Sequence, residues 1–196
     1  MQHAPLPMIS AKDYLDGELV SQIKHEYVAG QVFAMAGTSE RHNIITGNIQ
    51  ARLREKTRGG ACRVLMENVK LHVAAADAFY YPDVMVCCEP SDDDPYVKHS
   101  PIVVFEVLSH STASTDRREK LRAYRALPSL REYMLVDSDR HAVEAYRRKD
   151  GTWWRDVLDP GDALAIESLG LILSLDNLYE DVVLPELRED AAGYAA

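Results

Sequence analysis

The chain has 196 residues, of which 46% are hydrophobic and 27% are charged, values that are ordinary for a globular protein with a sizeable core. Its formal net charge of −9 argues against a protein that coats nucleic acid without specificity. No apolar run approaches the ~20 residues of a membrane span, and the chain does not start with a basic and then apolar leader, so we expect neither a membrane partner nor a signal peptide.

The first part of the chain predicts a helix followed by a β-hairpin. Residues 1–10 have the composition of a loose arm, and Ser10 or Asp13 can cap a short helix that runs to about Ile23. In the next segment, HEYVAGQVFAMAG, the Ala29-Gly30 pair interrupts two strand-like runs, as a hairpin turn does. Glu26 lies on the first of these strands, where it is either an edge residue facing solvent or a carboxylate directed at a functional site.

A longer helix is predicted from Ser39, a good N-cap residue, to about Thr57, where Gly59-Gly60 ends it. Within its first turn, we expect His42 to pack or to cap the helix. An apolar stripe along one side marks the face that packs on the core, at Ile44, Ile45, Ile49 and Leu53.

The three cysteines, Cys62, Cys87 and Cys88, show no C-x-x-C spacing, and two of them are adjacent. An odd number in this arrangement argues against a disulfide framework or a zinc site, so we expect core thiols in a reducing cytoplasm. The segment from Cys62 to Val73 has the pattern of a strand pair or of one long bent strand. Lys70 lies in its second half, where a neighbouring strand can bring it to a site formed around Asp83.

Two short apolar runs, Val84–Cys88 and Ile102–Leu108, predict buried strands. Asp83 stands at the start of the first run, and Glu106 lies inside the second. A buried carboxylate is costly unless it is paired or binds a metal. A salt bridge to an arginine of the next helix explains Glu106 alone. If the two strands are neighbours, however, Asp83 and Glu106 repel each other, and a divalent cation relieves that repulsion.

After these strands, a helix is predicted from about Ser114 to Ala126, where Pro128 stops it, and a strand over Leu130–Val136 follows. The helix carries a basic cluster, which is either a solvated face or a nucleic-acid contact, and its candidate contacts are Arg117, Arg118 and Arg122. Two further strands, 141–148 and 153–158, are joined by a Lys-Asp-Gly turn and predict a hairpin that extends the sheet. Residues 164–173 are apolar, 175–183 predict a terminal turn or helix, and the acidic tail from Pro185 is expected to fray.

This order of elements predicts a single α/β domain over residues 1–196 with a mixed central sheet. The Pro82-Asp83 pair, Glu106 and the basic helix that follows resemble the PD-(D/E)XK nuclease superfamily. Longer strings resemble one branch of it, the Uma-two family of restriction-endonuclease-like proteins. These strings cover most of the chain in order: HEYVAGQVFAMAG, RHNIITGNI, CRVLMENVKLHV, YYPDVMVCC, EVLSHST, DRREKLRAYRALPSLREYMLVD and DGTWW.

The resemblance implies an αβββαβ core, with the hairpin after Asp137 added to it, and a metal-dependent endonuclease that hydrolyses DNA. It implies Mg²⁺, with Mn²⁺ as an alternative, bound by Asp83, Glu106 and the carbonyl of Val107, with Glu26 completing the ligand shell. Position 108 departs from the pattern, because Leu108 stands where the superfamily has a lysine. Lys120 is our first candidate for the missing cation, since the family pattern has a lysine at this helix position, and Lys70 is our second.

Three hypotheses for the function follow. The first is a cytoplasmic DNA endonuclease, for which a homodimer would supply one site for each strand. The missing lysine keeps open a second hypothesis, a nuclease-like protein that binds nucleic acid or a partner without cutting. The acidic net charge permits a third, a metal-dependent hydrolase of another substrate.

Overall fold

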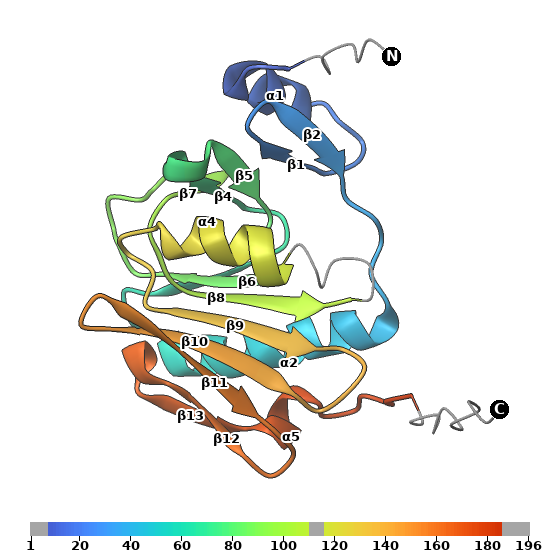
Figure 1. The fold of residues 1–196 in the computed structure, drawn as a ribbon, viewed down its shortest axis with the longest axis vertical. Helices are drawn as coiled ribbons and strands as arrows, with labels where there is room; N and C mark the ends of the chain where they lie inside the picture. Colours follow the sequence, from blue (N-terminus) through green and yellow to red (C-terminus); the bar gives the residue numbers. More distant parts are fainter. Residues whose placement is uncertain (1–7, 110–115, 186–196) are drawn as a thin grey trace, which may run out of the picture.

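The computed structural model describes residues 8–109 and 116–185, which form a mixed α/β structure with three sheets. The central sheet has six strands in the order β11-β10-β9-β8-β6-β3 (Figure 1). Their bounds are Arg63–Met66 for β3, Val84–Cys87 for β6, Pro101–Leu108 for β8, Glu132–Asp137 for β9, Val143–Lys149 for β10 and Thr152–Leu158 for β11. Because β8 and β9 are parallel and the other pairs are antiparallel, the sheet is mixed, as predicted.

Helices cover both faces of this sheet (Figure 1). One face packs on α2, Glu40–Thr57, and the other on a π-helical turn, η2, Asp116–Lys120, which continues into α4, Leu121–Arg125. The succession α2, β3, β6, β8, η2–α4 and β9 is the predicted αβββαβ core, to which β10 and β11 add the predicted hairpin. The start of the predicted helix, residues 114–115, lies outside the described residues.

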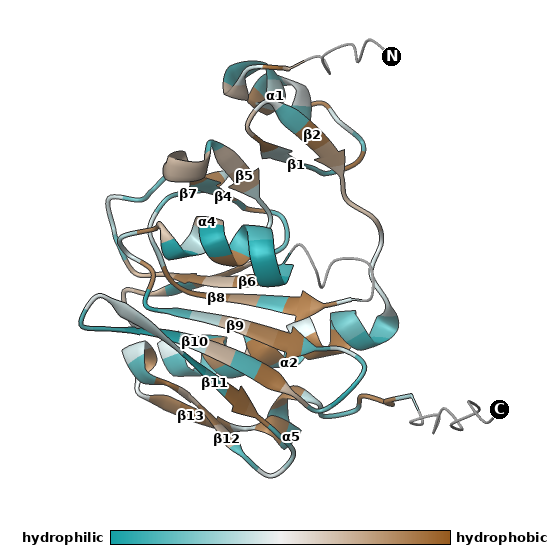
Figure 2. Ribbon diagram, viewed as in Figure 1, coloured by the Kyte–Doolittle hydropathy of each residue, from teal (hydrophilic) through white to brown (hydrophobic). Residues whose placement is uncertain are grey.

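From Val103 onward, the side chains of β8 alternate between the two faces of the sheet. Val103, Phe105 and Val107 lie in the core cluster that includes the α2 residues Ile45, Ile49 and Leu53. Val104 and Leu108 lie in the cluster on the opposite face, against Tyr124 and Leu127. Figure 2 shows these hydrophobic stretches on the central strands, while α4 turns hydrophilic residues to its outer side. Glu106 is only 2% exposed among these apolar neighbours.

A second sheet lies beyond α4, in the order β2-β1-β5-β4-β7, and it was not predicted. Its strands are β1, His25–Val28; β2, Gln31–Ala34; β4, Lys70–Val73; β5, Ala78–Tyr80; and β7, Val97–Lys98. The hairpin of β1 and β2 confirms the Ala29-Gly30 turn, since both residues have positive φ angles, 46° and 87°. Between β4 and β5, residues Ala74–Ala76 form a 3-10 turn, η1.

The segment 62–73 is therefore two strands in two different sheets. The chain turns at Glu67, which has a φ of 31°, so that β3 pairs with β6 while β4 pairs with β5 and β7. The expectation that the strand carrying Lys70 lies next to the strand of Asp83 was consequently wrong.

The first helix, α1, spans Ala11–Glu18 and is capped by Ser10, so it is shorter than predicted. The apolar residues after it do not reach the core: Leu19 is 68% exposed and Val20 is 83% exposed. Ser39 caps α2 as predicted, and α2 is the longest helix among the described residues, with 18 residues. None of the helices in this part of the chain is long and apolar enough to cross a membrane.

At the C-terminal end, residues 163–174 form an additional hairpin where only an apolar segment was expected. It consists of β12, Ala163–Ile166, and β13, Leu171–Ser174, joined by the 3-10 turn η3, Glu167–Leu169. The expected terminal helix is α5, Leu175–Leu178. Both elements pack on α2, which buries Leu164, Ile166 and Leu178 in the same cluster as Ile49.

The expectation of free core thiols was wrong for two of the three cysteines. Cys62 and Cys88 form a disulfide, whereas Cys87 is free and buried. The antiparallel pairing of Arg63 with Cys87 places Cys62 opposite Cys88 at the ends of β3 and β6. Spacing in the sequence does not reveal this pairing, because it depends on which strands are neighbours.

Candidate active site

The candidate site is a cleft of about 270 Å³ where the ends of β6 and β8 meet the start of α2. One wall comes from β1, β2 and the segment 35–38, and the other from β8 and the η2 turn. Its lining includes four carboxylates, one lysine and one histidine: Glu26, Asp83, Glu106, Asp116, Lys120 and His42. A second hollow of about 370 Å³ adjoins it, sharing the segment 35–38, Tyr81 and Asp83, and it also contains Glu67.

Asp83 and Glu106 lie on neighbouring strands of one sheet, as predicted, because Val84 pairs with Phe105. The backbone N–H of Asp83 donates to Glu106 Oε2 at 3.4 Å, and the backbone N–H of Val107 donates to Asp83 Oδ2 at 2.6 Å. The structure thus brings together the two carboxylates and the peptide of Val107. Val107 contacts Asp83 through its N–H group, whereas the metal-binding role predicted for Val107 belongs to its carbonyl.

Lys120 reaches into this cleft and contacts three carboxylates. Its Nζ lies 3.1 Å from Glu26 Oε1, 3.3 Å from Glu106 Oε1 and 3.2 Å from Asp116 Oδ1. Burial by itself lowers the pKa of Lys120, but the surrounding carboxylates, Glu106 first, outweigh burial and raise the pKa well above its usual value. Lys120 therefore carries a positive charge at every physiological pH.

Burial and neighbouring acids both disfavour the charged form of Glu106. Burial raises the pKa of Glu106 well above its usual value; Lys120 opposes this rise, while Asp83 adds to it. Its Oε1 is held by two donors, the Tyr124 hydroxyl at 2.8 Å and the Lys120 ammonium at 3.3 Å. Its Oε2 accepts only the long hydrogen bond from Asp83 among the contacts of the described residues, so this oxygen has the capacity to bind a cation.

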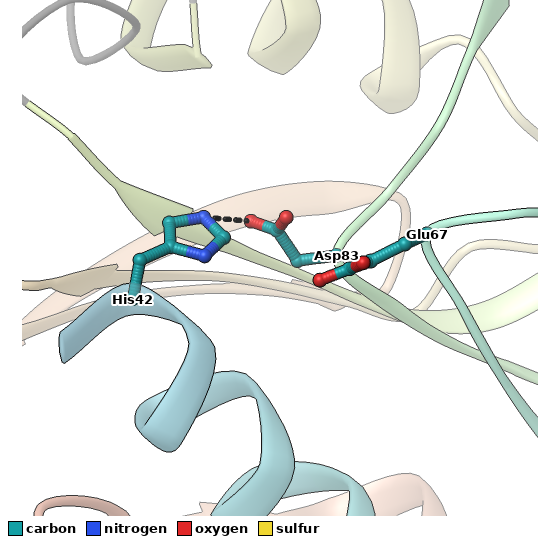
Figure 3. A group of neighbouring side chains, drawn as sticks. All are labelled: His42, Glu67 and Asp83. Carbon is teal, nitrogen blue, oxygen red and sulfur yellow. Dashed lines mark ion pairs between the residues drawn. The ribbon is translucent and has the colours of Figure 1, made fainter. Parts of the chain in front are cut away.

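His42, Glu67 and Asp83 form a second grouping around the same aspartate. Each offers one ligand atom, and these atoms lie within 4.8 Å of one another. Figure 3 shows His42 projecting from α2 toward Asp83, with Glu67 reaching in from the turn after β3; the dashed ion pair joins His42 Nε2 to Asp83 Oδ2 at 3.2 Å. Burial lowers the pKa of His42, but the hydrogen bond and charge of Asp83 outweigh it, and the pKa is raised.

These donors fit a divalent cation. Carboxylate oxygens suit hard cations such as Mg²⁺ and Mn²⁺, and one imidazole suits Mn²⁺ better than Mg²⁺. His42 Nδ1 lies 3.5 Å from the Thr46 hydroxyl, an arrangement in which a ring N–H can point at that oxygen and leave Nε2 free to bind a metal. The interpretation of His42 as a packing or capping residue did not include its ion pair with Asp83, and Glu67 was not considered. No pattern in the sequence marks Glu67, because it reaches the site only through the turn at the end of β3.

The remaining predicted residues lie in different places. Glu26 faces the cleft, where its Oε1 contacts Lys120, so the second of its two interpretations is the geometry found. Lys70 does not line the cleft; its ammonium lies 5.2 Å from the ring centre of Tyr81. Arg117 is held by Glu144, with Nε 2.9 Å from Oε1. Arg118 and Arg122 are exposed and stand two positions before and after Lys120, which turns them away from the cleft.

The chain is similar to known proteins over most of its length. A family model described as "Putative restriction endonuclease", Uma2, matches residues 11–176. Two relatives come from a Synechocystis strain. The uncharacterized protein slr1290 is 34% identical over 179 residues, which is 90% of this chain and 94% of the relative. The uncharacterized protein sll1609 is 30% identical over 154 residues, 77% of this chain and 87% of the relative.

A solved structure shares the fold. It is the crystal structure of a protein from Anabaena variabilis described as a putative nuclease belonging to DUF820. The TM-score is 0.73 at 19% sequence identity, and the match covers 89% of this chain and 99% of that chain.

Proposed function

Because the chain belongs to the Uma2 family, we propose that it is a metal-dependent endonuclease that hydrolyses phosphodiester bonds in DNA. The observation that carries this proposal is the meeting of Asp83, Glu106 and Lys120 in one cleft. Two carboxylates suited to a cation and one ammonium group are the components that phosphodiester hydrolysis needs around the reacting phosphate.

In this proposal, Asp83 and Glu106 Oε2 would hold the metal, and His42 and Glu67 would offer further ligand atoms beside Asp83. A bound Mg²⁺ or Mn²⁺ would lower the pKa of a water molecule and neutralise charge on the phosphate. Tyr124 and Lys120 both donate to Glu106 Oε1, which fixes the direction in which Oε2 points. Glu26 forms an ion pair with Lys120 at 3.1 Å, which helps to hold the ammonium group in the cleft.

Lys120 supplies the cation that is missing at position 108. Leu108 is 3% exposed and packs in the cluster on the α4 side of the sheet, so its position is part of the core. Since the carboxylates keep Lys120 protonated, its role is to stabilise negative charge that develops on the phosphate; it does not remove a proton from water.

A second candidate function rests on the same contacts. Lys120 already neutralises part of the acidic cluster, so the fold can exist without a metal and can serve as a nuclease-like binding protein that does not cut. Incubation with circular plasmid and with single-stranded DNA in Mg²⁺ or Mn²⁺ separates the two functions. We expect cleavage that disappears in chelator and in the Asp83→Ala variant, while Asp93→Ala, on an exposed loop, serves as the matched control. Metal binding without cleavage of either DNA would favour the second function.

Two features of the proposed endonuclease concern its assembly and location. A homodimer would bring two clefts to the two strands of a duplex, and sedimentation of the purified protein tests this stoichiometry. The Cys62–Cys88 disulfide offers a test of the proposed cytoplasmic location, since the cytoplasm of most organisms keeps cysteine pairs reduced. Thiol labelling of the protein in intact cells would show which state it holds there.

A further inference from the structure

We propose that the cleft takes an unpaired DNA strand, and that Phe33 stacks on a base beside the phosphate that is cut. This inference rests on the proposed endonuclease function and adds its substrate class. It is carried by the burial of the reacting groups, by the fixed position of the outer wall of the cleft and by one exposed aromatic ring on that wall.

Two of the reacting groups are almost fully buried: Glu106 is 2% exposed and Lys120 is 6% exposed. A metal–oxygen distance of about 2.1 Å on each side of the ion would place the phosphate oxygen within about 4 Å of the carboxylate oxygens. Duplex DNA is stiff, with a persistence length of about 150 base pairs. A flexible single strand can therefore bend its backbone toward buried groups more readily than a duplex can.

The outer wall is the β1–β2 hairpin, and it is held in place from three directions. Strand β1 pairs with β5 through Tyr27 with Phe79 and Val28 with Ala78. The carboxylate of Glu26 accepts a hydrogen bond from the Tyr81 backbone N–H at 3.3 Å and forms the ion pair with Lys120 at 3.1 Å. Opening the wall enough to admit a duplex would break these interactions, so the cleft is expected to keep its width.

Phe33 is the exposed aromatic ring on that wall. It lies directly opposite Glu26 in the register of the hairpin, so the two side chains share one face, and this face lines the cleft. The ring is 49% exposed. Aromatic rings beside a backbone-binding groove hold single strands by stacking with bases, which are available only when they are unpaired. Phe33 therefore has the position and the exposure of a stacking residue.

The substrate preference is tested with two DNA circles of the same length, so that neither offers an end. One is single-stranded and the other is a covalently closed, relaxed duplex, which lacks the unpaired regions that supercoiling creates. In Mg²⁺ or Mn²⁺, we expect the single-stranded circle to be cut about tenfold faster or more. Equal rates, or faster cutting of the duplex, would overturn the inference and leave the endonuclease function standing.

Binding gives a readout that does not depend on cleavage. The Lys120→Met variant keeps the proposed metal ligands, and fluorescence anisotropy in Mg²⁺ compares a labelled single strand with the same strand annealed to its complement. Tighter binding of the single strand supports the inference even if no DNA is ever cut, an outcome that would remove the proposed function alone. If Lys120→Met does not fold, the wild-type protein is used instead, with a single strand and a duplex whose phosphorothioate linkages resist cleavage. The affinities for these two DNAs are then compared in the same way.

Phe33 is tested by substitution in the wild-type protein. Phe33→Ala should weaken single-strand binding by about 5- to 150-fold, the range for one lost base stack, while Phe33→Trp should restore it. Val32→Ala is the matched control, since Val32 is 39% exposed on the opposite face of the same strand and does not line the cleft. Equal affinity of wild type and Phe33→Ala, or equal losses in Phe33→Ala and Val32→Ala, would contradict the stacking role.

Discussion

At the scale of single residues, the site is defined by an imbalance of charge around Lys120. Four carboxylates line the cleft, those of Glu26, Asp83, Glu106 and Asp116, and Lys120 contacts three of them. The acids raise the pKa of Lys120 well above its usual value, and burial together with acids such as Asp83 raises that of Glu106. Negative charge therefore remains in excess, and a divalent cation would relieve it.

The first prediction follows from this excess. Asp83→Asn keeps an oxygen that can accept the Val107 N–H but removes one negative charge. At alkaline pH, where His42 has lost its proton, the metal-free variant should therefore melt at the same temperature as wild type or higher. The same variant should lose cleavage activity. Thermal melting in chelator and a nuclease assay in Mg²⁺ check both parts. A large fall in melting temperature would instead show that Asp83 is a structural ion-pair partner of His42.

The second prediction concerns Lys120 itself. Lys120→Met keeps most of the stem and deletes the charge, so turnover should be abolished while the metal, which binds the carboxylates, should bind with nearly unchanged affinity. Lys70→Met is the matched comparison, because the Lys70 ammonium lies against Tyr81 outside the cleft and its loss should leave turnover near the wild-type value. Calorimetry of Mg²⁺ binding and steady-state kinetics give the two readouts. An active preparation that tolerates both substitutions would exclude either lysine as the cation.

The third prediction is a pH dependence that comes from His42. Its pKa in the folded protein is raised above the ordinary value of about 6.5, because Asp83 outweighs the effect of burial. A raised folded pKa stabilises the fold fully below about pH 6.5, and the contribution is lost as the pH rises through the folded pKa. In chelator, the stability difference between wild type and His42→Asn should therefore shrink from pH 6 upward, as denaturant titrations can measure. A difference that is constant or grows with pH would show that His42 is not charged in the fold.

At the scale of elements, the predictions succeeded where local patterns decide the structure. Ser39 and the apolar stripe of α2 specify a helix, and the Ala29-Gly30 turn specifies a hairpin, because these signals lie within a few residues of one another. The second sheet was missed because pairings such as β1 with β5 join segments about fifty residues apart. Glu67 and the partner of Cys62 depend on the same long-range pairings, so the sequence alone does not place them.

The fourth prediction tests the disulfide that joins β3 to β6. It closes a loop with a sequence separation of 26 residues, and a loop of this size stabilises a fold by about 3 kcal/mol. Reduction should lower the melting temperature of the wild-type protein by about 6–12 °C. Cys62→Ser should melt at the lower temperature with or without reductant. Identical melting of the wild-type protein under both conditions would show that the bond contributes nothing to the native state.

At the scale of the whole molecule, the net charge of −9 means that the proposed DNA substrate would have to be attracted by a bound metal and by local basic surface. The arginines of η2 and α4 were predicted as DNA contacts, and the structure divides them. Arg117 is paired with Glu144 and Asp137, while Arg118 and Arg122 are exposed and form no ion pair within the described parts of the chain. Their contribution to DNA binding stays a prediction, as does the assignment of residues 1–196 to one domain.

The fifth prediction tests that basic surface. If Arg118 and Arg122 contact phosphates outside the cleft, replacing both with Gln should weaken single-strand binding and reduce the slope of log K against log salt by about 1.4. Anisotropy titrations at several salt concentrations measure this slope. An unchanged slope would mean that both arginines belong to a solvated face of the helix and do not contact DNA, which was the alternative interpretation from the sequence.

The Cys62–Cys88 bond also sets how the molecule would respond to mechanical force. Residues 62–88 form a covalent ring that contains both Glu67 and Asp83, whereas His42 lies outside it. Force applied to the two ends of the chain would draw His42 away from Glu67 and Asp83. Between Cys62 and Cys88, the disulfide would carry this force, so the ring itself would not be extended. About 90 Å of contour length would stay hidden until the bond is reduced. In a stretching experiment, His42 of the oxidised protein would therefore separate from Glu67 and Asp83, while these two carboxylates remained tethered within the same loop.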